Sequence, residues 1–82
     1  MSTLPEFVIE KALFGFRVVA TPDPGRLVRA SFRRAGNKGF SEAVGYAVRW
    51  AAEANGKLID RTGRLSDSEC AELVVAMRTR AP

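Results

Sequence analysis

Two alternating segments joined by a turn-rich stretch constrain the fold of this chain most strongly. Residues 14–20 and 27–33 each alternate between apolar and polar or small side chains, as strands with one covered face do. Between them, residues 21–25 (TPDPG) form a turn signal, because proline fixes φ and glycine accepts a positive φ. We therefore predict an antiparallel β-hairpin. The side chains expected on its covered face are Phe14, Phe16, Val18, Ala20, Val28, Ala30 and Phe32.

The segment before the hairpin, residues 6–13, is compatible with two structures. Phe7, Ile9, Lys11 and Leu13 alternate as in a strand. Helical spacing also runs through the segment, and Pro5 suits the first turn of a helix. We favour the strand, which would add a third member to the sheet.

A central helix is expected to follow the hairpin. Ser41 is a suitable N-cap, and the pair Asn55-Gly56 is a typical stop signal. The loop before it, residues 36–39 (GNKG), leads to the helix start, and residues 57–60 can form a short strand after it. The inner stripe expected for this helix is Val44, Ala47, Val48 and Ala51.

The C-terminal helix has the clearest start signal in the chain. Ser66 and Glu69 have the spacing of a capping box, in which each side chain bonds the other residue's backbone N–H. Leu65 and Cys70 occupy the two positions of a hydrophobic staple. The apolar stripe that follows is Cys70, Leu73, Val74 and Met77.

These elements predict one α+β domain over residues 1–82. The expected architecture is a small antiparallel sheet of three or four strands with two helices packed on one face. With 82 residues, the chain has room for a single modest core.

Composition excludes several kinds of site. The chain has no histidine and one cysteine, so it can form neither the usual zinc sites nor an intramolecular disulfide. Cys70 lies on an apolar stripe and is expected to be a core residue. No apolar run reaches the roughly 18 residues of a membrane span, and residues 1–6 lack signal-peptide character, so we expect a cytoplasmic protein. We expect no cofactor and no enzymatic activity.

Positive charge is concentrated in the hairpin region. Residues 17–38 contain six basic side chains and a single acid, Asp23. This segment therefore has a net charge of +5, whereas the whole chain has a net charge of +4. A basic ribbon of this kind is typical of proteins that bind nucleic acid, a nucleoprotein complex or an acidic protein surface. Lys38, in the loop before the helix, would add a phosphate contact. The predicted polyanion-binding residues are Arg17, Arg26, Arg29, Arg33, Arg34 and Lys38.

Tyr46 and Trp50 have two interpretations. They lie four residues apart on the flank of the central helix, where they can close the edge of a small core. Tyrosine and tryptophan are also enriched at binding hot spots, so the same pair is our candidate protein interface, either with another protein or in a homodimer.

Parts of the chain resemble a known DNA-binding domain. Residues 27–34, 39–43 and 50–53 look like the strand–strand–helix arm domain of phage integrases. The resemblance covers about half of the chain and implies DNA binding. The chain departs from that pattern in its further strand and second, capped helix.

In size and layout the chain is also similar to small phage-encoded inhibitors such as anti-CRISPR proteins. This resemblance is not carried by any motif. It implies stoichiometric binding to a protein subunit of a nucleoprotein complex, which is our alternative hypothesis for function.

Overall fold

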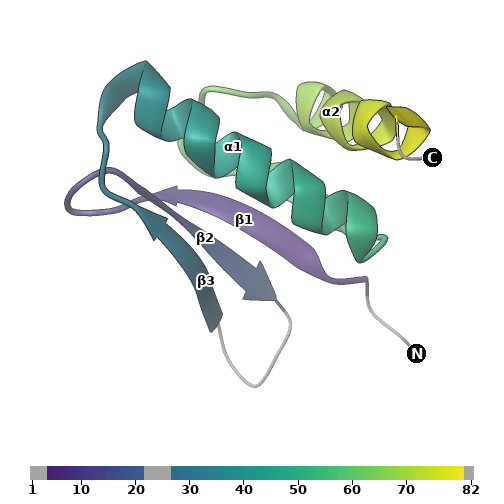
Figure 1. Ribbon diagram of the computed structural model, residues 1–82, viewed down its shortest axis with the longest axis horizontal. Helices are drawn as coiled ribbons and strands as arrows, with labels where there is room; N and C mark the ends of the chain where they lie inside the picture. Colours follow the sequence, from purple (N-terminus) through teal and green to yellow (C-terminus); the bar gives the residue numbers. More distant parts are fainter. Residues whose placement is uncertain (1–3, 22–26, 81–82) are drawn as a thin grey trace.

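The computed structural model describes residues 4–21 and 27–80, with the backbone alone at 27–29 and 80, and it has an α+β architecture (Figure 1). Four strands form one sheet in the order β3-β2-β1-β4. The elements are β1 (Glu6–Lys11), β2 (Phe16–Thr21), β3 (Leu27–Phe32), α1 (Gly36–Glu53), β4 (Lys57–Asp60) and α2 (Asp67–Arg80).

The α+β class is confirmed, but the sheet is mixed rather than wholly antiparallel. β1 pairs antiparallel with β2, and β2 with β3, whereas β4 pairs parallel with β1. The connection through α1 explains this difference. α1 carries the chain back along the sheet, so β4 runs in the same direction as β3 and therefore also as β1.

The first segment is a strand, as favoured, and it lies in the interior of the sheet. Phe7 and Ile9 are buried in the core that faces the helices. The chain then turns at residues 12–15, where Gly15 has a φ of +93°. The inward position predicted for Phe14 is wrong, because this turn comes before β2 and leaves Phe14 74% exposed.

The predicted β2–β3 hairpin is confirmed. Phe16 lies opposite Phe32, and Val18 lies opposite Ala30. The register then shifts, because Val19 pairs with Val28, so β3 contains one extra residue at this point. Residues 22–26, which include most of the predicted turn, lie outside the described part of the chain.

α1 begins earlier than predicted, at Gly36 rather than after a Ser41 cap. The buried Gly39 makes this possible, since a Cβ there would lie 1.7 Å from the carbonyl oxygen of Arg34. Small side chains then let the helix lie close to the sheet. Val44, predicted to face inward, is only half-buried and lines a groove against α2. The buried residues of α1 are Gly39, Ala43, Ala47, Val48 and Ala51.

The stop signal after α1 is confirmed. Asn55 adopts a left-handed conformation with φ of 56°, and the Gly56 N–H donates to the Ala51 carbonyl at 2.8 Å. A Cβ on Gly56 would lie 2.5 Å from the carbonyl oxygen of Pro5. The chain therefore reverses tightly and enters β4 beside β1.

The start of α2 also agrees with its sequence signal. The Glu69 N–H donates to Ser66 Oγ at 3.1 Å, and the Ser66 N–H donates to Glu69 Oε1 at 3.0 Å, which completes the capping box. Cys70 and Val74 are buried against the core, whereas Leu73, predicted on the same stripe, is 37% exposed. α2 thus covers α1 and β4 through a narrow face.

Candidate nucleic-acid interface

The described members of the predicted polyanion-binding set lie in two places: Arg17 is in β2, and the others lie between β3 and the first turn of α1. Arg17 lies on the sheet face away from the helices, because its neighbours Phe16 and Val18 enter the core. Its Nε donates to Glu10 Oε1 at 3.1 Å across the β1–β2 pair. Arg17 is therefore part of an ion pair on the sheet face away from the helices, and it does not line the hollow described below.

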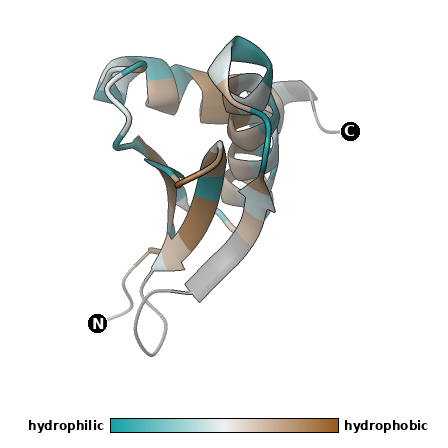
Figure 2. Cartoon of the chain, turned by 90° about the vertical axis from the view of Figure 1, so that its left-hand side faces the viewer, coloured by the Kyte–Doolittle hydropathy of each residue, from teal (hydrophilic) through white to brown (hydrophobic). Residues whose placement is uncertain are grey.

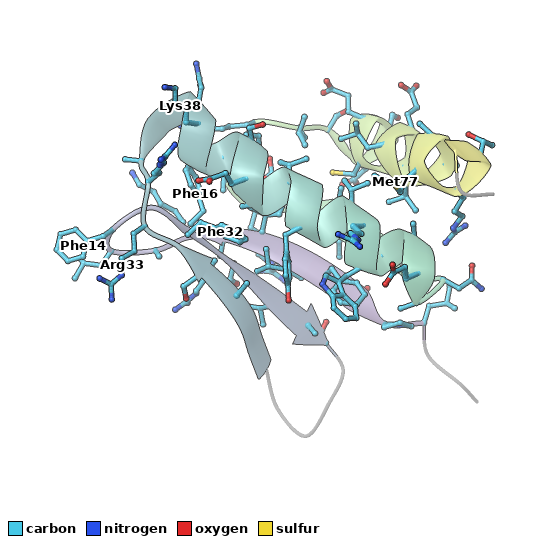
Figure 3. All side chains as sticks on the ribbon, in the orientation of Figure 1. Phe14, Phe16, Phe32, Arg33, Lys38 and Met77 are labelled. Carbon is cyan, nitrogen blue, oxygen red and sulfur yellow. The ribbon has the colours of Figure 1, made fainter. Side chains whose placement is uncertain are left out.

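The remaining predicted residues follow the chain from the hairpin turn to the start of α1. Arg26 lies outside the described residues, and only the backbone of Arg29 is described, within β3. Arg33 and Arg34 are exposed in the loop after β3, and Lys38 is exposed in the first turn of α1. Figure 3 shows Arg33 and Lys38 projecting from the same end of the molecule.

Two further basic residues reach this end from distant parts of the sequence. Lys11 is the last residue of β1, and Arg64 lies in the loop between β4 and α2. Neither belongs to the charge-rich stretch, and only the topology of the sheet and the crossover brings them there. We call the resulting set the basic end: Lys11, Arg33, Arg34, Lys38 and Arg64.

A shallow hollow of about 270 Å³ lies at the basic end. The described residues that line it include Lys11, Arg33 and Arg64 but no carboxylate. Within the described chain, neither Arg34 nor Lys38 makes an ion pair, in contrast to Arg17. The positive charge here is thus available to an outside anion.

The start of α1 adds to this positive field. Ala35 occupies the N-cap position and makes no side-chain hydrogen bond, and the first turn contains no acid. The first backbone N–H groups of a helix have no partner within the helix, and they carry the positive end of its dipole. In α1 these groups lie beside the hollow, which Gly36 and Ala35 help to line.

Arg64 is held in position by the loop in which it lies. The Asp60 carboxylate accepts hydrogen bonds from the backbone N–H groups of Arg64 and Leu65, at 2.9 and 2.7 Å. The Arg64 guanidinium carbon lies 5.3 Å from the Phe16 ring centre and 5.1 Å from that of Phe40, within the range of cation–π contact. Sequence reasoning missed this residue, although Asp60 four positions earlier is a turn-forming signal.

An apolar turn stands next to these charges. Leu13 is 90% exposed and Phe14 is 74% exposed, and both line the hollow. Figure 2 faces this end of the molecule, where the brown turn lies among hydrophilic teal segments. Leu13 and Phe14 thus place an exposed apolar surface directly beside the positive charge of the basic end.

The candidate protein interface at Tyr46 and Trp50 is largely taken up by internal packing. The Tyr46 ring lies 5.7 Å from the Phe32 ring in an edge-to-face arrangement, and 6.1 Å from Trp50. Both side chains are half-buried and pack against the core. They close the helix-facing side of the sheet near β3.

The described acidic and cysteine side chains are the remaining candidates for chemistry. In the ranges 4–21 and 27–80, no group of three or more acidic or cysteine side chains is arranged to hold a metal ion. Glu6 accepts a hydrogen bond from the Thr21 hydroxyl, and Glu10 is engaged with Arg17. Burial raises the pKa of the Cys70 thiol, and this favours its neutral form.

Comparison with protein-family models, curated proteins and solved structures finds no match to this chain. Across the described residues, neither helix has the length and apolar character needed to cross a membrane.

Proposed function

We propose that this protein is a non-enzymatic binding module whose basic end holds the phosphate groups of a nucleic acid. The observation that carries the proposal is the convergence of basic side chains from β1, the β3–α1 loop, α1 and the β4–α2 loop. Three of them, Lys11, Arg33 and Arg64, line a hollow whose described lining has no carboxylate, and Arg34 and Lys38 are exposed in the adjoining loop and first turn of α1. The bound nucleic acid would be free or part of a nucleoprotein complex.

Phosphate suits this end for two physical reasons. The guanidinium groups of Arg33 and Arg34 are planar forks that match two phosphate oxygens. The start of α1 supplies backbone N–H groups and a positive dipole end, a combination that binds phosphate in many proteins. A polymer of phosphates can engage several of these groups together.

Fluorescence anisotropy with labelled single-stranded DNA, RNA and duplex DNA tests the proposal. Five phosphate contacts would give a log–log slope of affinity against salt of roughly −3 to −5. Arg33→Glu should weaken binding by roughly tenfold at low salt and reduce this slope, since it removes one contact and repels another.

Arg49→Glu is the matched control. It changes the net charge of the protein by the same amount, but Arg49 lies on the exposed side of α1 and pairs with Glu53 at 3.7 Å. Equal effects of the two variants would refute a local site. If the wild-type protein binds no nucleic acid at low salt, the proposal fails. The alternative then comes first: a phage-encoded inhibitor, acting as a monomer or a homodimer, that docks on an acidic protein surface.

A further inference from the structure

We infer that the basic end binds single-stranded nucleic acid and that the exposed ring of Phe14 stacks on an unpaired base. The inference rests on the proposed function and names the ligand of the same site. It starts from the turn at residues 12–15, whose tip presents Leu13 and Phe14 to solvent beside Arg33. Figure 3 shows the Phe14 ring and the Arg33 side chain projecting outward at this end.

The turn that carries Phe14 is fixed rather than free to fold inward. The Ala12 N–H donates to the Gly15 carbonyl at 2.9 Å and closes the turn. Gly15 lies directly against the end of β3, where a Cβ would stand 1.9 Å from the Phe32 carbonyl oxygen and 2.9 Å from that of Arg34. The backbone that holds the phenyl ring is therefore packed against the loop that holds the arginines.

Phe14 is not needed to fill the core. Phe16, two residues later, is 3% exposed and packs edge-to-face against Phe40 at 5.5 Å. The Arg64 guanidinium lies over both of these rings. Phe16 thus supplies the aromatic ring of the core at this end, and the Phe14 ring stays exposed at the edge of the hollow, within reach of a ligand bound there.

An aromatic ring among unpaired cations fits a ligand that is both anionic and aromatic. A single strand presents phosphates and the faces of its bases, and base–aromatic stacking is a large part of how proteins bind such strands. A duplex encloses its base faces between neighbouring pairs. It therefore offers phosphates to this surface but no stacking partner for Phe14.

The test compares Phe14→Ala and Phe14→Trp with the wild-type protein, using a labelled oligothymidylate and a duplex of equal length. Loss of one stacked base should weaken single-strand binding by about tenfold. Duplex affinity and the salt slope should stay unchanged, because the phosphate contacts remain. Phe14→Trp should keep the single-strand affinity, and its added fluorescence should be quenched by the strand.

Val75→Ala is the matched control, since it shortens an exposed apolar side chain on α2 that does not line the hollow. If Phe14→Ala binds the single strand like wild type while Arg33→Glu weakens it, the inference is overturned and the proposed function stands. Equal losses for strand and duplex would also overturn it. So would a Phe14→Ala defect seen only with vesicles of anionic lipid, which would indicate membrane docking. If the wild-type protein binds neither the single strand nor the duplex, the proposed function itself is refuted.

Discussion

The two helices of this protein begin in opposite ways. α2 starts with a complete capping box between Ser66 and Glu69, and Asp67 adds a negative charge to its first turn. α1 starts at Ala35 without a side-chain cap, has no acid in its first turn and carries Lys38 there instead. The first backbone N–H groups of any helix have no partner within the helix. In α2 the Ser66 side chain accepts a hydrogen bond from one of them, whereas in α1 no capping side chain does so.

The difference shows where each helix obtains its stability. α2 packs through a narrow face and depends more on its local signals. α1 lies across the sheet and buries a continuous row of small residues, so tertiary packing can hold it without a cap. A helix start that is left open and surrounded by basic side chains is then available for an anion.

The largest expected effect comes from the contact that fixes the start of α1. In Gly39→Ala the new Cβ would overlap the Arg34 carbonyl oxygen, so the helix start must move away from the β3–α1 loop. We expect a loss of about 3 kcal/mol in the free energy of unfolding, measured by urea denaturation.

Gly45→Ala is the control, because a Cβ at this exposed position of α1 would meet nothing within 4 Å. Helix propensity should make this variant more stable by about 0.5–1 kcal/mol. Should Gly39→Ala also gain stability, packing against Arg34 does not determine where α1 begins.

Removing the cap of α2 should have a smaller effect. Ser66→Ala deletes the oxygen that accepts from the Glu69 N–H, and we expect a loss of about 1 kcal/mol in the same denaturation experiment. Ser68→Ala, at an exposed position in the first turn, should change stability by less than about 0.5 kcal/mol. Equal losses in the two variants would contradict the role of the capping box.

Adding a capping side chain to α1 tests whether its uncapped start differs in stability and in anion binding from the capped start of α2. Ala35 already has the extended conformation of an N-cap residue, so Ala35→Asp should stabilise the protein by roughly 0.5–1 kcal/mol. The same carboxylate should weaken nucleic-acid binding, because it occupies the helix start and repels phosphate. Ala35→Ser should stabilise without adding charge and should cost less affinity. Stronger binding by Ala35→Asp would exclude the helix start from the site.

The smallest expected effect concerns Cys70, one turn beyond the α2 cap. Burial, followed by the Asp60 carboxylate, raises the pKa of this thiol above its ordinary value of 9.0. The folded state therefore holds the proton more tightly than the unfolded state. The stabilising contribution is complete below pH 9 and is lost as the pH rises through the folded pKa.

Urea denaturation between pH 7 and 10 measures this loss, and Cys70→Ala should remove that part of the pH dependence. In the native protein at neutral pH, a thiol reagent should react with Cys70 far more slowly than it does in urea. Fast reaction in the folded protein would show that the helix start, which favours a thiolate, outweighs burial.

Helix caps, stop signals and alternation, which involve only residues close together in the sequence, are sufficient to predict several elements. The capping box of α2, the Asn55-Gly56 stop and the alternation of β2 and β3 are confirmed by the structure. The start predicted for α1 is too late in the chain, because no capping side chain marks the true start, which the close contact of Gly39 with Arg34 permits. Phe14 was placed inside because alternation cannot show where a strand begins.

The candidate site could be predicted only in part. Arg33, Arg34 and Lys38 follow one another closely in the chain, so a count of charges along the sequence finds them. Lys11 and Arg64 are far from them in sequence. Arg17 lies within the charged stretch, yet the alternation of β2 places it on the sheet face away from the helices, where it pairs with Glu10.

The sequence by itself determined the α+β class, the order of the elements and the excess of positive charge, because these follow from periodicity, caps and composition. Only the tertiary structure decided that β4 runs parallel to β1, and which cations share the basic end. It also decided that Phe14 stands among them. These features depend on contacts between distant segments, whose geometry is set by the path of α1 across the sheet and by sheet register.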